Sequence, residues 1–216
     1  MKVLSAVGAA LLATFLQTGY SAATESSSEQ ALAGGVAARE YAATLPPIGF
    51  VRFCTANPKE CEKYSVTERM GPSRLVMTQA KWNLLYQVNT LVNSQIQPMS
   101  DQELYGKPEH WTYPATAGDC EDYLLLKKRR LEQHGFPARD LRITVVLQEK
   151  GEGHAVLTVT TNEGDFVLDN RRNDILLWSD TQYTFLKRQS GNDPKRWVAL
   201  VATPAVQAGS TAASNK

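Results

Sequence analysis

Three residues in the second half of the chain have the types of a nucleophile, a base and an orienting carboxylate. Cys120 is followed 34 residues later by His154 and a further 15 residues later by Asp169. A thiol becomes a nucleophile when a base lies within hydrogen-bond reach, and the base needs a third group that fixes its tautomer. The three types predict thiol-based nucleophilic catalysis. Taken singly, His154 could be a structural buried histidine and Asp169 could open a turn with Asn170.

The residues around Cys120 predict that it begins a helix. Acidic residues follow it directly, basic residues stand near residue 130, and Gly135 and Pro137 lie just beyond. Acids in the first turn, bases in the last and a glycine after the end are typical of a helix. The backbone N–H groups and dipole at a helix N-terminus favour a thiolate, so this position suits a nucleophilic cysteine.

The elements that would position the three residues are a helix and an antiparallel meander. Residues 141–147 alternate apolar and polar side chains, and further strands are expected at 154–160 and from residue 166. A second amphipathic helix is expected over residues 78–97, closed by Pro98. This order predicts an α+β fold in which N-terminal helices, with the nucleophile at one helix N-terminus, pack on an antiparallel sheet.

The register of the last two strands decides whether His154 reaches Asp169. If paired positions sum to 325, Asp169 faces Val156 and His154 is its diagonal neighbour, at ~7–8 Å between Cα atoms. If they sum to 327, Asp169 faces Thr158 and His154 lies too far away without a bulge. Both registers remain open from the sequence.

The two ends of the chain differ in composition from its middle. An apolar run follows Met1–Lys2 and small residues end it, so residues 1–23 are expected to be a secretory signal peptide. An uncleaved N-terminal anchor is the alternative, although the run is shorter than the ~20 residues of a membrane span. We expect a flexible arm over residues 24–44, a catalytic domain over 45–202 and a disordered tail over 203–216. No membrane embedding is expected after signal cleavage.

Export makes the three cysteines informative, because an oxidising compartment favours disulfides. Cys54 and Cys61 flank the turn signal Asn57–Pro58 and are expected to form a disulfide. Cys120 is then a single thiol that needs another explanation. The formal net charge of +1 offers no basic field for nucleic acid, so no nucleic-acid partner is expected.

Several motifs, taken in order, resemble the bacterial transglutaminase-like cysteine proteinases. The resemblance runs from about Phe50 to Trp197. It is carried by these segments: Gly118–Tyr123, Arg142–Val146, Gly151–Leu157, Gly164–Asn170, the pairs Val88–Asn89 and Val92–Asn93, and Lys187–Ser190.

The resemblance implies a papain-like fold in its transglutaminase variant, with Cys120 as nucleophile, His154 as base and Asp169 as orienting carboxylate. Relatives of this kind are periplasmic proteases that cut surface adhesins and release biofilms, so a periplasmic or secreted location and an adhesin-like protein substrate are expected. An inner-membrane receptor that regulates the protease is also implied. The relatives use calcium, which would here be held by Asp119 and Glu121. Without a metal, Asp119 would cap the helix and Glu121 would complement its dipole.

The sequence therefore predicts an exported cysteine endopeptidase that works through a thioester acyl-enzyme. One alternative is a transglutaminase or amidase that passes the acyl group to an amine. Another is a non-catalytic binding module in which the three residues are structural.

Overall fold

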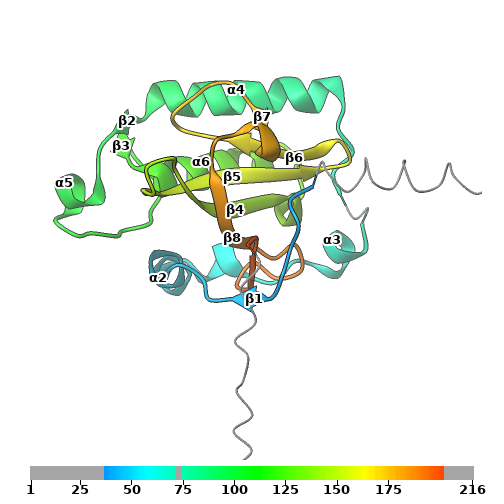
Figure 1. Ribbon diagram of the computed structural model, residues 1–216, viewed down its shortest axis with the longest axis horizontal. Helices are drawn as coiled ribbons and strands as arrows, with labels where there is room; N and C mark the ends of the chain where they lie inside the picture. Colours follow the sequence, from blue (N-terminus) through cyan, green and yellow to red (C-terminus); the bar gives the residue numbers. More distant parts are fainter. Residues whose placement is uncertain (1–36, 72–73, 202–216) are drawn as a thin grey trace, which may run out of the picture.

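One antiparallel sheet forms the centre of the molecule (Figure 1). The structure is a computed structural model, and it describes residues 37–71 and 74–201. Within these residues the sheet has seven strands in the order β1-β9-β8-β4-β5-β6-β7. Their bounds are β1 (Ala43–Thr44), β4 (Leu141–Leu147), β5 (Gly153–Thr161), β6 (Gly164–Leu168), β7 (Leu176–Leu177), β8 (Thr184–Gln189) and β9 (Trp197–Ala199). A short parallel pair, β2 (Gln97–Pro98) and β3 (Ala117–Gly118), lies apart from it. The predicted combination of helices with an antiparallel sheet is confirmed.

The register between β5 and β6 follows the first of the two sequence alternatives. Thr160 pairs with Asp165, and Thr161 pairs with Gly164 around a two-residue turn. These paired positions sum to 325, the register that makes His154 the diagonal neighbour of Asp169. Strand β5 is buried on both faces, with Leu157 and Val159 in the larger core cluster and Val156 in the smaller one, so a slip by one residue would exchange the side chains between the two clusters.

Five α-helices and three 3₁₀ turns occur in the described parts of the chain. The helices are α2 (Ile48–Ala56), α3 (Val66–Met70), α4 (Gln79–Gln95), α5 (Asp101–Tyr105) and α6 (Cys120–Gln133), and the turns are η1 (Pro58–Cys61), η2 (Ala138–Asp140) and η3 (Trp178–Asp180). The helix predicted over 78–97 is α4, with the Thr78 side chain accepting a hydrogen bond from the Lys81 amide. In Figure 1, α4 runs along one side of the sheet and α6 lies behind it.

Helix α6 starts and stops where local sequence signals predict. It begins at Cys120 and packs against β5 and α4 through a face that includes the buried Leu124 and Leu131. Past its end, Gly135 adopts a φ of 83°, and the Phe136 amide donates back to the Leu131 carbonyl. This is the glycine-based C-terminal motif that satisfies the last carbonyl groups of a helix.

The described end of the predicted arm is part of the folded body. The Ala38 amide donates to the buried Asp165 carboxylate at 2.9 Å, and β1 pairs with β9. Asp165 also binds Arg74 and the buried Arg188, so residues 38–44 are fastened to the sheet by charged and backbone bonds. The predicted leader, residues 24–36 and the predicted tail lie outside the described residues. No helix among the described residues is both long and apolar enough to cross a membrane.

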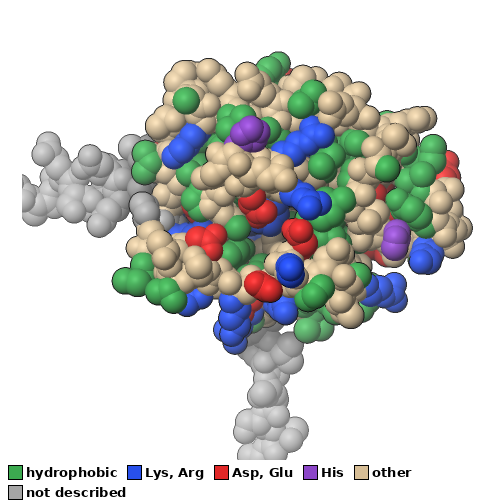
Figure 2. Space-filling view, turned by 180° about the vertical axis from the view of Figure 1, so that it is seen from behind, with side chains coloured by type: hydrophobic (Ala, Val, Ile, Leu, Met, Phe, Trp, Pro, Cys, Tyr) green, Lys and Arg blue, Asp and Glu red, His purple; other side chains and the backbone are tan. Residues whose placement is uncertain are grey.

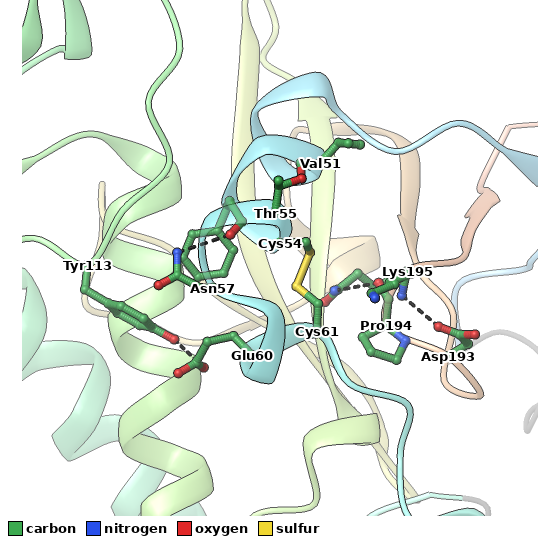
Figure 3. Close-up of a disulfide and its surroundings, with 12 residues drawn as sticks. Val51, Cys54, Thr55, Asn57, Glu60, Cys61, Tyr113, Asp193, Pro194 and Lys195 are labelled. Atoms are coloured by element: carbon green, nitrogen blue, oxygen red, sulfur yellow. Dashed lines mark hydrogen bonds between the residues drawn. A yellow bond between two sulfur atoms is a disulfide. The ribbon is translucent and has the colours of Figure 1, made fainter.

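The predicted disulfide between Cys54 and Cys61 is formed, with the two Cα atoms 5.6 Å apart (Figure 3). Asn57 turns the chain between them and donates its side-chain amide to the Phe53 carbonyl. Beside the bridge, the Tyr113 hydroxyl donates to Glu60 at 2.6 Å. The disulfide therefore joins α2 to η1 next to the core.

The charge of the molecule is balanced on the face seen from behind in Figure 2. Acidic and basic side chains lie beside one another in the middle of that face. This intermixing matches the formal net charge of +1 and gives this face no broad field of a single sign.

Candidate active site

The thiol of Cys120 lies at the first position of α6 and is partly buried. It donates to the neighbouring Glu121 carboxylate, with 3.0 Å between Sγ and Oε2. Burial and the Glu121 carboxylate raise the pKa of the Cys120 thiol well above its usual value, while a backbone hydrogen bond from Ala155 opposes the rise. The expectation that the helix N-terminus alone favours the thiolate left out this carboxylate, which acts in the opposite direction.

The side chains of His154 and Asp169 meet inside the molecule. His154 stands near the start of β5 and Asp169 directly follows β6, and the distance from His154 Nε2 to Asp169 Oδ1 is 2.9 Å. Both residues are nearly inaccessible to solvent, with exposed fractions of 6% and 1%. The β5–β6 register thus produces an imidazole–carboxylate pair of the kind in which an acidic group orients a histidine.

The ionisation of Asp169 determines which histidine nitrogen carries the proton. Burial disfavours the carboxylate, but hydrogen bonds from His154, the Tyr183 hydroxyl and the Arg171 amide outweigh it and lower the pKa of Asp169 to about 2. An ionised carboxylate only accepts hydrogen bonds, so Nε2 of His154 must be the donor. A neutral imidazole in this tautomer leaves Nδ1 as the acceptor, which is the form that a general base needs.

The structure places Cys120 beside the strand that carries His154. Its thiol interacts with the backbone of Ala155, the residue after His154, because α6 packs on β5. The structure therefore joins His154 to Asp169 by a hydrogen bond and brings Cys120 to the same end of β5. Among the described residues, the Cys120 thiol and the His154 imidazole are not hydrogen-bonded to each other. Catalytic hydrogen bonds are often long before substrate is bound.

Two asparagines of α4 hold the loop that follows Asp169. The Asn93 side-chain amide donates to the carbonyl of Asp169 at 3.0 Å and to that of Arg172 at 2.9 Å. Asn89, which is fully buried, donates to the carbonyls of Arg172 and Asn173. The motif segments in the sequence contained both asparagines, but their role becomes visible only when α4 lies against this loop.

A cluster of three aspartates also lies at the N-terminus of α6. One oxygen each from Asp101, Asp119 and Asp122 comes within 4.8 Å of the other two, and Asp101 and Asp122 are only 1% and 0% exposed. The amide of His110 binds one Asp101 oxygen, and the amide of Thr112 binds one Asp122 oxygen. The remaining oxygens, Asp101 Oδ1, Asp119 Oδ1 and Asp122 Oδ2, are buried and have no partner among the described residues.

Ionisation of the carboxylates in this cluster is unfavourable when no cation lies between them. Burial, together with the charges of Asp119 and Asp101, raises the pKa of Asp122 to about 7. Burial and Asp119 likewise raise the pKa of Glu121. Asp119 occupies the N-cap position of α6 but makes no capping hydrogen bond through its side chain. Carboxylates this close together, with three buried oxygens that accept no hydrogen bond, have the chemistry of a cation site.

The sequence identified Asp119 and Glu121 as candidate ligands and missed Asp101 and Asp122. Glu121 groups with Asp119 and the Cys120 thiol, while Asp119 is common to both groups of candidate ligands. Asp122 is adjacent in the sequence, but Asp101 is separated from it by a long connection, and only the fold brings the two together. Tyr183 was also missed, because no local signal relates it to Asp169.

Comparisons with known proteins give the family of the chain. A family model described as bacterial transglutaminase-like cysteine proteinase matches residues 40–204. No curated protein matches the chain. Calcium-bound LapG from Legionella pneumophila is a similar solved structure, with 24% identity, coverage of 61% of this chain and 76% of that one, and a TM-score of 0.48. A second structure of LapG from that organism has 25% identity, coverage of 57% and 69%, and a TM-score of 0.47, and an EGTA-treated form gives the same values. Because the family model spans most of its length, the chain belongs to the bacterial transglutaminase-like cysteine proteinases and is a cysteine peptidase.

Proposed function

We propose that the chain is an exported endopeptidase in which Cys120, His154 and Asp169 form the catalytic triad. The hydrogen bond of 2.9 Å between His154 and Asp169 is the observation that carries this proposal. The position of Cys120 at the N-terminus of α6, against the residue that follows His154, supports it.

In the proposed mechanism, Nδ1 of His154 takes the proton of the Cys120 thiol, and the thiolate attacks the carbonyl carbon of a peptide bond. The resulting oxyanion is stabilised by backbone N–H groups at the start of α6, of which the Cys120 amide is one. The imidazolium returns its proton to the leaving amine, the C–N bond breaks, and a thioester remains on Cys120. Water, deprotonated by His154, then attacks the thioester, which releases the carboxylic acid product and restores the thiol.

Asp169 has an orienting role in this sequence of steps. Its ionised carboxylate accepts the Nε2 proton of His154 and stabilises the positive charge that forms on the imidazole. The side-chain amide of Asn93 donates to the backbone carbonyl of Asp169, and the Arg171 amide donates to one oxygen of the Asp169 carboxylate. These bonds keep the base in one orientation.

We also propose calcium as the resident cation, held by Asp101, Asp119 and Asp122 with Glu121 beside them. The fit is supported by the three buried, unpartnered oxygens and by carboxylates as the donor type that calcium prefers. When bound, calcium supplies positive charge that offsets the crowded carboxylates next to the nucleophile. LapG has been solved in calcium-bound and EGTA-treated forms. In this arrangement Asp101 of α5 and the residues Asp119 and Asp122 of α6 would together fix the start of α6.

The proposed location is the periplasm or the exterior of the cell. The predicted leader over residues 1–23 and the disulfide between Cys54 and Cys61 support export to an oxidising compartment. The proposed substrate is a protein of the cell surface of the adhesin type, and a membrane receptor is the proposed regulator. Both follow from the family resemblance.

The test digests denatured surface proteins with the mature chain and identifies new N-termini by mass spectrometry. We expect cleavage by the wild type but not by Cys120→Ala or His154→Ala. His134→Ala is the control and should also cleave, because His134 is exposed at the C-terminal end of α6. Repeating the digestion with added ethylamine distinguishes hydrolysis from acyl transfer. Products that carry ethylamine would favour the transglutaminase alternative, and cleavage by Cys120→Ala would contradict the proposed nucleophile.

A further inference from the structure

Tyr183 binds the oxygen of Asp169 that His154 leaves free. Oδ1 of Asp169 accepts from His154 Nε2 at 2.9 Å and from the Arg171 amide at 3.0 Å. Oδ2 accepts from the Tyr183 hydroxyl at 2.6 Å. Asp169 is 1% exposed, so solvent cannot readily satisfy Oδ2 if this hydroxyl is removed.

The ring of Tyr183 also contacts the imidazole. The ring centroids of Tyr183 and His154 are 5.6 Å apart, with an angle of 62° between the planes, which is the edge-to-face arrangement preferred by aromatic pairs. Tyr183 therefore contacts both members of the hydrogen-bonded His154–Asp169 pair.

Tyr183 also lines an open cavity of about 350 Å³. Its partly exposed side chain lines the cavity together with Arg171, Arg172 and Gln148. Tyr183 lies one residue before β8, in the connection that follows η3.

The phenol remains a donor throughout the neutral range. Burial, with the hydrogen bond to Asp169 and its charge, raises the pKa of Tyr183 to about 12. An ionised carboxylate paired with a protonated phenol forms a charge-assisted hydrogen bond, which is stronger than one between neutral groups.

We propose that Tyr183 is a positioning residue of the triad: its hydroxyl fixes the rotation of the Asp169 carboxylate and thereby stabilises the His154–Asp169 hydrogen bond. The role of Tyr183 in catalysis rests on the proposed function, but its effect on the His154–Asp169 bond can be measured without any substrate. Tyr183 acts through Asp169 and His154 and takes no part in bond making.

The chain offers a matched control for this tyrosine. Tyr113 donates to the Glu60 carboxylate at the same distance of 2.6 Å, beside the disulfide (Figure 3), and makes no hydrogen bond to His154 or Asp169. Tyr113→Phe removes a hydroxyl–carboxylate bond of the same type, so it reports the cost of such a bond to folding alone.

The experiment compares the wild type, Tyr183→Phe and Tyr113→Phe by proton NMR and by iodoacetamide alkylation of Cys120 at pH 7. The Nε2 proton of His154 is assigned with His154→Ala, and its exchange with water is measured. We expect Tyr183→Phe to speed this exchange at least about tenfold and to slow alkylation about tenfold, the change that one pKa unit represents. Tyr113→Phe should change neither rate, although both variants lose thermal stability.

The exchange rate of the Nε2 proton decides the proposal. If Tyr183→Phe folds and this proton exchanges at the wild-type rate, Tyr183 does not position the pair and the proposal is wrong. If His154→Ala is alkylated at Cys120 as fast as the wild type, the proposed triad fails instead, whatever the exchange rate shows. The two failures are therefore distinguishable.

Discussion

Lys127 provides a quantitative test of the electrostatics around the proposed triad. It lies on α6, two turns after Cys120, and is 1% exposed, and its Nζ has no hydrogen-bond partner among the described residues. Burial lowers the pKa of Lys127 from 10.5 to about 7, and the charge of Asp169 opposes this change only in part. We predict that Lys127→Met makes the folded protein more stable at neutral pH.

The magnitude follows from the pKa difference between the folded and unfolded chains. At about 1.4 kcal/mol per pKa unit, a fall of about 3.5 corresponds to about 5 kcal/mol of unfolding free energy that the charged lysine costs at low pH. Replacing buried charges by apolar side chains of similar volume gains about 1–4 kcal/mol where it stabilises, and we expect Lys127→Met to fall within this range.

The sign of the pH dependence can be stated from the same values. The unfolded chain binds more protons than the folded one between pH 7 and about 10.5, so the unfolding free energy of the wild type rises with pH in this window. The advantage of Lys127→Met is therefore largest at pH 7 and below, and shrinks to less than about 1 kcal/mol near pH 10.5.

The assay is urea unfolding of both proteins, with chelator present, at pH 7 and near pH 10. Lys128→Met is the matched control, because Lys128 is paired with Glu132 at 2.6 Å and also donates to two carbonyls. We expect this control to lose stability. The reasoning is refuted if Lys127→Met is less stable than the wild type at pH 7, or if its advantage grows toward pH 10.

Three further outcomes follow from the structure. Asp101→Asn should weaken calcium binding at least about tenfold by isothermal titration calorimetry, while the exposed Asp180→Asn should not; equal affinities would contradict the proposed ligand set. Replacing Cys54 and Cys61 with serine should lower the unfolding free energy by about 2–3 kcal/mol in denaturant titrations, and an unchanged midpoint would show that the bridge contributes nothing. Asp165→Ala removes the fully buried partner of Arg188 and leaves that arginine with Glu40 alone, so thermal unfolding should show a loss of about 3–5 kcal/mol; a change below about 1 kcal/mol would refute this.

Much of the site could be predicted because its signals are local. The acids, bases and glycine around 120–135 define the ends of α6, so the position of Cys120 follows from its own neighbours. The alternation over 141–147 predicts β4 to the residue. The turn between β5 and β6 allows two pairing registers, and the structure has the register in which His154 and Asp169 are hydrogen-bonded.

The remaining features depend on contacts between distant segments. Strand β8 buries Arg188 and Gln189, which bind Asp165 and the Ile143 amide, so its sequence lacks the apolar alternation of a strand. Asp101 begins α5, and the connection between α5 and α6 must fold back before Asp101 can lie beside the N-terminus of α6. The effect of Glu121 on the Cys120 thiol depends on the rotamer that places its carboxylate 3.0 Å away, which no sequence pattern specifies.

The most direct test of the proposed triad is the rate at which iodoacetamide alkylates Cys120 at pH 7, followed by peptide mass spectrometry. We compare the mature wild type with His154→Ala, and use His134→Ala as the histidine control, each with calcium and with chelator. The proposed pair predicts that His154→Ala slows alkylation at least about tenfold and that His134→Ala does not. Equal rates in the wild type and His154→Ala, with and without calcium, would contradict the assignment of Cys120 and His154 as nucleophile and base.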